Sequence, residues 1–280
     1  MKLSVISDGH FRLDGGAMFG VVPKVIWERK APADEQNRIR LAAASILVEI
    51  KGKKILIDTG MGDKWSKKER TIFAVEQPPT LVESLARRGI TPDEIDYVIL
   101  THLHFDHSGG GTRRNEAGNL VPTFPNARYV VQKKEWYAAT HPHDRNRASY
   151  REENFRPLEA AGLLDIIDGD VEVMKGIRCR LSGGHSVGHQ IILLEGREGV
   201  ACHLGDECPT RAHLPGPWVM GYDLDPLRAM QQKTRYSEEG QDLGWVMIAA
   251  HDPEQPFFRL SRNEKDRLVG TALGEDTIEL

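Results

Sequence analysis

The sequence predicts an α/β fold in which two mixed β-sheets are covered by helices, and three observations support this prediction. Strand-like and helix-like segments alternate along the chain. Several apolar, strand-like runs end directly in histidine or aspartate, as expected when strands deliver polar groups to one edge of a sheet. The 280 residues, 40% of them hydrophobic, suffice for two core layers in one domain spanning residues 1–280.

The N-terminal part of the chain holds a predicted hairpin, a helix and a buried strand. Residues 45–50 and 54–58 are strand-like and flank a KGK turn, a pattern typical of a β-hairpin. Residues 80–83 have the sequence TLVE, a capping box that predicts the start of a helix. Residues 96–100, DYVIL, are apolar and β-branched and predict a buried strand.

The C-terminal part continues this alternation. Residues 176–181, 200–204 and 245–250 are short apolar runs that predict strands. Residues 225–240 begin with Asp-Pro, which predicts the start of a helix because aspartate can cap a helix whose first residue is proline. The whole pattern therefore favours two sheets with helices on their outer faces.

The strongest chemical signal is the run THLHFDHSGG at residues 101–110, directly after a predicted strand. His102 and His104 are two positions apart, so in an extended segment they face the same side and can bind one metal ion. Asp106 and His107 follow where the chain must turn, and could reach a second ion. Unrelated surface histidines are the weaker interpretation, because the 11 histidines of the chain are concentrated here.

A site with two metal ions needs more donors than this run supplies, and three further candidates each follow a predicted strand. They are His185, Asp206 and His251. Ligands from several strand ends that converge on one edge are typical of an active site built on sheets. Cys208 lies two residues after Asp206 and could also reach a metal, but a reduced core thiol is the commoner case.

Together these motifs resemble those of the metallo-β-lactamase-fold hydrolases. The resemblance is carried by IDTG at 57–60, THLHFDHSGG at 101–110, GGHSVGH at 183–189, LGDE at 204–207 and AAHDP at 249–253. The five motifs follow one another in the family's order over residues 45–253. The resemblance implies the αββα sandwich of that family, in which two mixed sheets face each other between layers of helices and the metals lie at one sheet edge.

The resemblance also implies a role for each candidate ligand. His102, His104 and His185 would bind the first ion, Asp106, His107 and His251 the second, and Asp206 would bridge the two. Asp58 would orient the ligand loop from outside the metal shell. His189 could act in the same way or be a hydrogen-bonded structural histidine. Zinc suits such a histidine-rich set best, while manganese, iron and cobalt stay open.

A narrower resemblance points to the quorum-quenching lactonases, which open N-acyl homoserine lactones. It is carried by GGAMFGVVPK at residues 15–24, by DECPTRAH at 206–213, and by a WxxxYDxxP pattern at 218–226. One position departs from the family. Many of its lactonases have a tyrosine three residues after the bridging acid, where it helps to hold the substrate carbonyl, and this chain has Pro209 there. Tyr222 or His213 would have to replace it, or metal alone would hold the carbonyl.

The predicted activity is lactone hydrolysis by attack of a metal-bridging hydroxide, with Asp106 moving the proton to the departing alkoxide. A phosphotriesterase or arylesterase of the same fold is an alternative, because it would differ only in pocket shape. A glyoxalase II-like thioester hydrolase is another. A non-enzymatic scaffold is disfavoured, because structural zinc sites are closed with four protein donors and this set has seven.

Residues 14–27 and 133–164 lie outside the ligand motifs and are the expected specificity elements. The first is glycine-rich but carries large apolar side chains, which the protein itself, a partner in a homodimer or an apolar substrate chain could bury. The second is polar, aromatic and weakly helical. The substrate is therefore expected to be a small lactone or ester with an apolar chain.

The net charge of −4 and a pI near 6.3 provide no long-range attraction for nucleic acid. No apolar run reaches the length of a membrane span and no leader pattern opens the chain, so we expect a cytoplasmic protein without a membrane partner. The three cysteines cannot all pair with one another, which favours reduced thiols.

Overall fold

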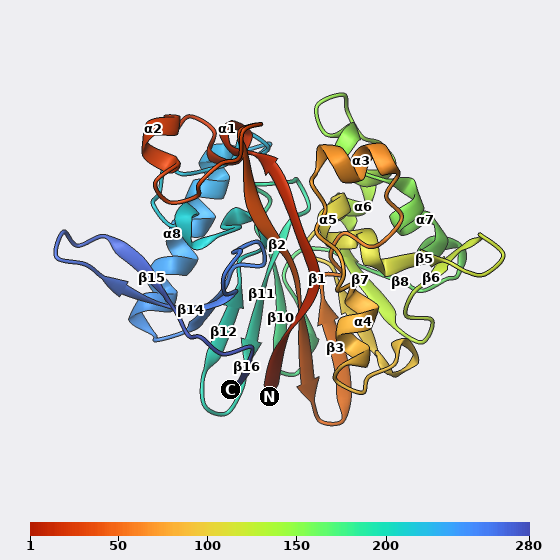
Figure 1. Ribbon diagram of the computed structural model, residues 1–280. Coiled ribbons are helices and arrows are strands. Elements are labelled where there is room, and N and C mark those ends of the chain that lie inside the picture. Colours follow the sequence, from red (N-terminus) through yellow and green to blue (C-terminus); the bar gives the residue numbers. More distant parts are fainter. The chain divides into compact units, whose positions relative to one another are not determined.

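The computed structural model describes residues 1–280 and contains two seven-stranded mixed sheets with helices packed on them (Figure 1). The first sheet has the order β16-β1-β2-β3-β4-β7-β8, and the second has the order β15-β14-β13-β12-β11-β10-β9. A two-stranded ribbon, β5-β6, completes the strands. The predicted α/β class with two mixed sheets flanked by helices is therefore confirmed.

The strands are β1 (Lys2–Asp14), β2 (Arg38–Ile50), β3 (Lys53–Ile57), β4 (Tyr97–Ile99), β5 (Thr112–Arg114), β6 (Leu120–Pro122), β7 (Arg128–Gln132), β8 (Leu164–Ile167), β9 (Val171–Met174), β10 (Ile177–Leu181), β11 (Gln190–Glu195), β12 (Val200–His203), β13 (Val246–Ile248), β14 (Phe257–Arg262), β15 (Leu268–Ala272) and β16 (Thr277–Glu279). The α-helices are α1 (Gly15–Phe19), α2 (Lys24–Trp27), α3 (Lys67–Ile72), α4 (Leu81–Ala86), α5 (Phe105–Ser108), α6 (Lys133–Thr140), α7 (Glu152–Ala160) and α8 (Pro226–Asp242). Short 3-10 helices lie at Pro92–Glu94, Gly109–Gly111, Arg147–Ser149, Gly205–Glu207 and Arg211–His213.

The chain divides into two compact units, and β1 and β2 each run through both. The first unit consists of Met1–Gly9 and Ala43–Asp168, and the second of His10–Ala42 and Gly169–Leu280. A single functional domain over residues 1–280 stays a prediction.

In the first unit, the sheet brings polar residues to one edge. β2 and β3 form the predicted antiparallel hairpin, with Ile46 opposite Ile57. β3, β4, β7 and β8 are parallel, so the carboxyl ends of β3 and β4 lie at the same edge. The chain leaves β3 into Asp58 and leaves β4 toward His102. The parallel pairing therefore explains why two distant motifs belong to one site.

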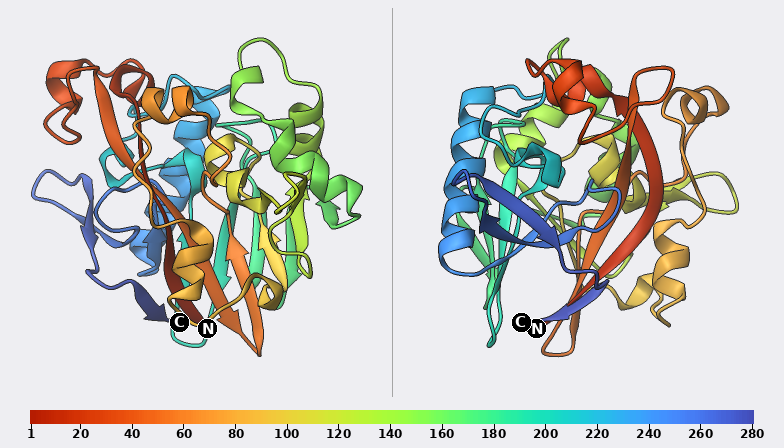
Figure 2. Two further views of the ribbon diagram at one scale, coloured as in Figure 1. Left: turned by 45° about the vertical axis from the view of Figure 1, so that its right-hand side comes forward. Right: turned by 60° about the vertical axis from the view of Figure 1, so that its left-hand side comes forward.

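One helix of the first unit, α4, begins where the sequence predicts. Thr80 caps α4 with a complete capping box that includes Glu83. α6 packs on β7 and β8, and α7 packs on the β5-β6 ribbon (Figures 1 and 2). Both helices lie within residues 133–164, where the sequence predicted weak helical character. The core beneath them includes Leu47, Val98 and Phe155.

In the second unit, two parallel strands of the second sheet likewise end at one edge. β10 pairs antiparallel with β9 and β11, and β11 pairs antiparallel with β12. β12 and β13 are parallel, so these two strands end at the same edge. Asp225 caps α8 by accepting a hydrogen bond from the Arg228 amide, which confirms the predicted helix start. α8 packs along β13 and β14 (Figure 2).

Residues 14–27 form two short helices, α1 and α2, and the turn between them. Asp14 caps α1 by accepting a hydrogen bond from the Ala17 amide. Phe19 and Trp27 are buried and stack on each other at a ring-centroid distance of 5.2 Å, so the second unit itself buries these side chains. Val21 and Val25 remain exposed. Self-packing thus accounts for the large aromatic residues of this segment.

None of the helices combines the length and the hydropathy needed to cross a lipid bilayer.

Asp8 of β1 joins three segments of the first unit and makes its stability depend on pH. Its carboxylate accepts hydrogen bonds from the amides of Gly62 and Leu81, each at 2.7 Å, and from the Gln77 side chain at 3.1 Å. Burial raises the pKa of Asp8 from 3.8 to about 7, although these backbone hydrogen bonds oppose the shift. The folded state therefore binds more protons than the unfolded state between these two pH values.

We expect the free energy of unfolding to fall as the pH rises from 4 through about 7, because the stability contributed by protonated Asp8 is lost over that interval. Asp8→Asn should flatten this decline, and Asp144→Asn, at an exposed position whose charge is not among those that shift the pKa of Asp8, should leave it unchanged. Urea titrations at pH 5 and pH 7.5 on the three proteins measure the effect. If the unfolding free energy falls by the same amount between pH 5 and pH 7.5 in wild type and in Asp8→Asn, then Asp8 does not titrate in this range.

Candidate metal centre

The first unit gathers the residues of the THLHFDHSGG motif after β4. The chain turns at His104, whose carbonyl accepts hydrogen bonds from the amides of His107 and Ser108 and so starts the single turn α5. The ring centroids of His102 and His104 lie 4.5 Å apart, and those of His102 and His107 lie 4.1 Å apart. All three side chains are buried. The structure therefore brings together the imidazoles that the spacing predicted.

The donor atoms of these residues are close enough to share ions. Those of His102 and His104 lie within 4.8 Å of each other, as do those of His102 and His107. Asp106 and His107 form a further pair, with 4.0 Å between Oδ2 and Nε2. Buried nitrogen and carboxylate donors at such distances are the chemistry that divalent metals bind.

Asp58 orients His107, as predicted. It follows β3 directly and has a φ of 57°, in the left-handed region. Its carboxylate accepts a hydrogen bond from His107 Nδ1 at 2.9 Å and from the Thr101 amide at 2.7 Å. Because Nδ1 is then the protonated nitrogen, Nε2 of His107 keeps its lone pair for a metal ion.

The glycines after the motif allow two backbone segments to approach closely. A Cβ on Gly109 would lie 2.0 Å from the carbonyl oxygen of Met61, and a Cβ on Gly62 would lie 2.4 Å from that of Gly109. The Gly109 amide donates to the Gly60 carbonyl at 2.9 Å. Glycine is therefore needed here so that the segment after Asp58 can support the metal-binding turn.

In the second unit, Asp206 lies between two of the predicted ligands. Its Oδ2 is 3.4 Å from His185 Nε2, and its Oδ1 is 3.3 Å from His251 Nε2. One carboxylate thus presents one oxygen to each histidine. This arrangement matches what a bridging carboxylate requires.

The hydrogen bonds of His185 and His251 indicate which ring nitrogen of each is left for a metal ion. His185 Nδ1 donates to Asp223 at 2.8 Å, and His251 Nδ1 donates to the Ala42 carbonyl at 2.8 Å. In the neutral imidazoles, each Nε2 is then an acceptor that faces a carboxylate oxygen, so a cation between them, a metal ion or a proton, would stabilise the pair. Burial alone would lower the pKa of His185, but the negative charges of Asp206 and Asp223 have the larger effect, so the pKa rises from 6.5 to about 9. The residues fit a metal centre.

His189 and Glu207 form a chain of polar contacts that reaches the backbone of Asp206. His189 Nε2 accepts a hydrogen bond from the Asp206 amide at 3.0 Å, and its Nδ1 lies 3.4 Å from Glu207 Oε1. Glu207 also accepts from the Gly184 amide at 2.9 Å, and burial raises its pKa. His189 thus holds the backbone of Asp206, and these contacts are compatible with both roles that the sequence left open for it.

Three residues of the following loop have different environments. His213 is fully buried, its two ring nitrogens contact Thr210 Oγ1 and the Met18 carbonyl at 2.8 Å each, and burial lowers its pKa to about 3. Burial raises the pKa of Cys208 to about 12, which keeps this ligand alternative a thiol. Tyr222 is 38% exposed. Of the two candidates for the carbonyl contact, Tyr222 is thus the accessible one.

Sequence reasoning missed several supporting residues. Asp223 orients His185, Glu207 holds the segment before it, and Glu135 contacts the metal-binding turn. Glu207 follows Asp206 in LGDE, and Asp223 follows Tyr222 in the YD pair, so both lie in motifs that had been singled out. Nothing in the local sequence distinguishes Glu135 from an exposed helical glutamate.

An aromatic cluster adjoins the motif in the first unit. Phe105, between His104 and Asp106, packs with Trp65 and Phe73 at centroid distances of 5.4 and 5.3 Å. The Arg151 guanidinium lies 4.2 Å from the Trp65 ring centroid and pairs with Glu69 at 2.6 Å. The metal-binding turn therefore carries an apolar surface beside its polar donors.

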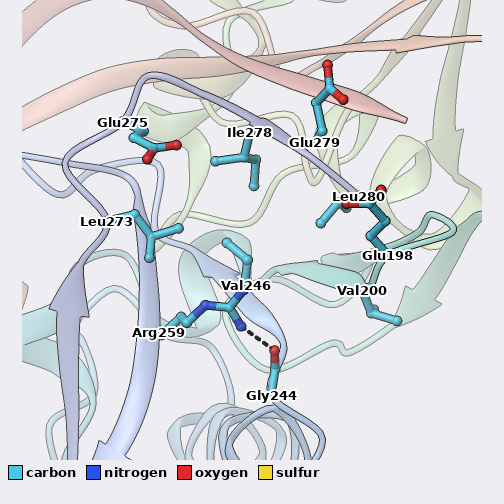
Figure 3. A pocket seen from close by; sticks show the side chains of 11 residues that line it. Glu198, Val200, Gly244, Val246, Arg259, Leu273, Glu275, Ile278, Glu279 and Leu280 are labelled. Carbon is cyan, nitrogen blue, oxygen red and sulfur yellow. Dashed lines mark hydrogen bonds between the residues drawn. The ribbon is translucent and has the colours of Figure 1, made fainter.

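Two cavities of the second unit lie apart from the predicted ligands. One of about 340 Å³ is lined by Glu198, Glu275, Glu279 and Arg259, and Arg259 donates a hydrogen bond to the Gly244 carbonyl (Figure 3). The other, of about 960 Å³, lies among the Arg211–His213 turn, α8 and the β14-β15 hairpin. Neither lining includes a predicted metal ligand.

The chain is similar to several known proteins in sequence and in fold. Residues 38–251 match the model of the metallo-beta-lactamase superfamily. An N-acyl homoserine lactonase of Bacillus thuringiensis is 29% identical over 220 residues, covering 75% of this chain and 80% of that protein.

Two solved structures extend the comparison. A "probable metal-dependent hydrolase" from Staphylococcus aureus has 34% identity and a TM-score of 0.86, covering 92% of this chain and 91% of that one. An N-acyl homoserine lactone hydrolase, solved with the product N-hexanoyl-L-homoserine at its catalytic metal center, has 26% identity and a TM-score of 0.69, with coverages of 90% and 93%.

Proposed function

Because the chain belongs to the metallo-beta-lactamase superfamily, we propose that this metal-dependent hydrolase opens lactone rings and that its substrates are N-acyl homoserine lactones. Asp206 carries the dinuclear part of the proposal, since its two oxygens face different histidines. Similarity to N-acyl homoserine lactonases over 75% of the chain supports the lactone part. Opening such lactones would make the enzyme quorum-quenching.

The proposal assigns two divalent ions to seven residues. The first ion is held by His102, His104 and His185, the second by Asp106, His107 and His251, and Asp206 belongs to both. The hydrogen bonds that hold His107, His185 and His251 by their Nδ1 atoms support this assignment. Zinc is the proposed metal because imidazole nitrogen dominates the donor set, and manganese, iron and cobalt are the alternatives.

When bound, two such ions would activate water near neutral pH and stabilise negative charge on the carbonyl oxygen. The protein residues then have separate tasks. Asp106 accepts the proton of the attacking water and gives it to the departing alkoxide. Tyr222, which is exposed, donates a hydrogen bond to the substrate carbonyl in place of the tyrosine that Pro209 replaces.

The acyl chain needs apolar surface, and the cluster of Trp65, Phe73 and Phe105 offers it in the first unit. Phe105 and Phe73 are half-buried, so parts of their rings can be covered by a ligand. This supports a substrate with an apolar chain. The cytoplasmic location and the homodimer expected from the sequence stay predictions.

Initial rates on three substrate classes test the proposal. A long-chain N-acyl homoserine lactone, a paraoxon-type phosphotriester and a simple aryl ester are compared on protein whose metal content has been counted. We expect a lactone kcat/KM at least about a hundredfold above the other two, about 2.7 kcal/mol of preferential transition-state stabilisation, lost on chelation and regained with metal. Faster turnover of the phosphotriester or of the aryl ester would contradict the lactonase proposal and favour a phosphotriesterase or an arylesterase, respectively.

Asp106→Asn should lower kcat for the lactone by about a hundredfold or more while the protein still binds metal, because the amide cannot move the proton. The control is Asp144→Asn, an exposed residue of the same unit. Metal analysis and kcat are measured together on both variants. Full turnover of an Asp106→Asn protein with two bound ions would remove Asp106 from proton transfer.

A further inference from the structure

Glu135 is a buried carboxylate that contacts the backbone of the metal-binding motif. It lies in the first turn of α6, and its side chain has 0% exposure. Its Oε1 accepts a hydrogen bond from the Leu103 amide at 3.0 Å. The same oxygen accepts a second hydrogen bond, from the Tyr150 hydroxyl at 2.9 Å. One carboxylate oxygen thus joins α6, the motif and the segment before α7.

Leu103 is the residue between His102 and His104, and its position decides how the two imidazoles point. Its side chain is fully buried in the core of the first unit, away from the donors. Rotation of the peptide before Leu103 would turn His102 away from His104, because neighbouring residues of an extended segment alternate in direction. The hydrogen bond to Glu135 opposes this rotation. Without it, the buried Leu103 amide would lose this hydrogen-bond partner, which is unfavourable for a donor shielded from water.

Tyr150 contacts His104, the second histidine of this segment. It forms an isolated antiparallel bridge with His104. The centroids of the Tyr150 and His104 rings lie 4.9 Å apart at an interplanar angle of 59°. Since Tyr150 is 7% exposed and its hydroxyl donates to Glu135, the ring cannot shift without breaking that bond. The orientation of His104 is therefore linked to the same carboxylate.

We infer that Glu135 and Tyr150 are positioning residues that hold the His102-Leu103-His104 segment in its metal-binding geometry. The inference rests on the proposed metal centre and not on the identity of the substrate. A glutamine at position 135 keeps one acceptor oxygen in the same place, whereas an alanine removes it. Phenylalanine at position 150 keeps the ring and removes only the hydroxyl. These variants separate the hydrogen bonds from packing.

The test measures metal binding without turnover. Zinc affinity is determined by competition with a chromophoric chelator, and the visible spectrum of the cobalt-substituted protein reports the ligand geometry. Wild type is compared with Glu135→Gln, Glu135→Ala, Tyr150→Phe and the control Lys134→Ala, an exposed neighbour on the same helix. The thermal midpoint of each metal-free variant shows how far general stability has changed.

We expect Glu135→Ala to lower zinc affinity by about 10- to 100-fold and to change the cobalt spectrum. Glu135→Gln should recover affinity to within about fivefold of wild type, Tyr150→Phe should lie between the two, and Lys134→Ala should match wild type. If Glu135→Ala does not fold, the Gln and Phe variants decide the question.

Unchanged affinity and spectrum in Glu135→Ala, or in Tyr150→Phe where Glu135→Ala does not fold, would overturn the inference. Metal affinity lost in Glu135→Gln as fully as in Glu135→Ala would also overturn it, because the acceptor oxygen would then not be the cause. A wild-type protein that binds two ions but leaves lactones intact would remove the lactonase proposal and leave this inference standing.

Discussion

Replacing Asp206 with alanine will lower the kcat/KM for lactone hydrolysis by at least about a thousandfold, about 4 kcal/mol, and reduce the bound metal from two ions to at most one. The reason is the shared carboxylate. His185 Nε2 and His251 Nε2 lie 3.4 and 3.3 Å from different oxygens of Asp206, so a single truncation removes a donor from each proposed ion.

Metal analysis after dialysis and initial rates on the same sample measure this effect. Asp276→Ala, an exposed aspartate in the same unit, is the control and should retain two ions and full rate. Asp206→Asn adds a graded test, because an amide keeps one oxygen but lacks the negative charge. An Asp206→Ala protein with two ions and a rate within tenfold of wild type would contradict the bridging role.

Lys233→Met will lower the free energy of unfolding by about 3 kcal/mol, the largest stability loss that we expect from one substitution. Lys233 of α8 is fully buried, and its Nζ donates to the carbonyls of His213, Pro215 and Trp218 at 2.7, 3.1 and 2.7 Å. Methionine fills a similar volume but donates no hydrogen bond. The loss comes from three carbonyl groups deprived of a shared donor.

Urea unfolding of the metal-free protein measures this prediction, and Gln231→Met on the exposed side of α8 serves as its control. The slope of the unfolding free energy against urea concentration should stay the same, so that the change lies in the midpoint. The loop that Lys233 holds follows Asp206 and contains His213, so its order depends on α8. A loss below about 1 kcal/mol would show that water replaces the ammonium donors.

The local sequence determined much of this protein. The hairpin around Gly52, the capping box at Thr80 and the capped start of α8 were all predictable, because turn residues and caps act within a few positions. The candidate ligands were predictable for the same reason. An extended segment that carries His102 and His104 presents both imidazoles on one side whatever the rest of the chain does. Asp58 was expected, from its IDTG motif, to orient the ligand loop, and in the structure its carboxylate accepts a hydrogen bond from His107 of that loop.

Only the tertiary structure decided which groups orient those ligands. Asp223 lies in the WxxxYDxxP pattern, but that pattern does not show that its carboxylate accepts a hydrogen bond from Nδ1 of His185, 38 positions away. His251 is held by the Ala42 carbonyl, 209 positions away, and Leu103 by Glu135, 32 positions away. Each of these partners is an ordinary carbonyl or carboxylate until folding buries it beside a histidine or an unpaired amide. Local patterns specify which donors a strand presents, whereas the pairing of buried polar groups depends on packing between remote segments, which no short pattern contains.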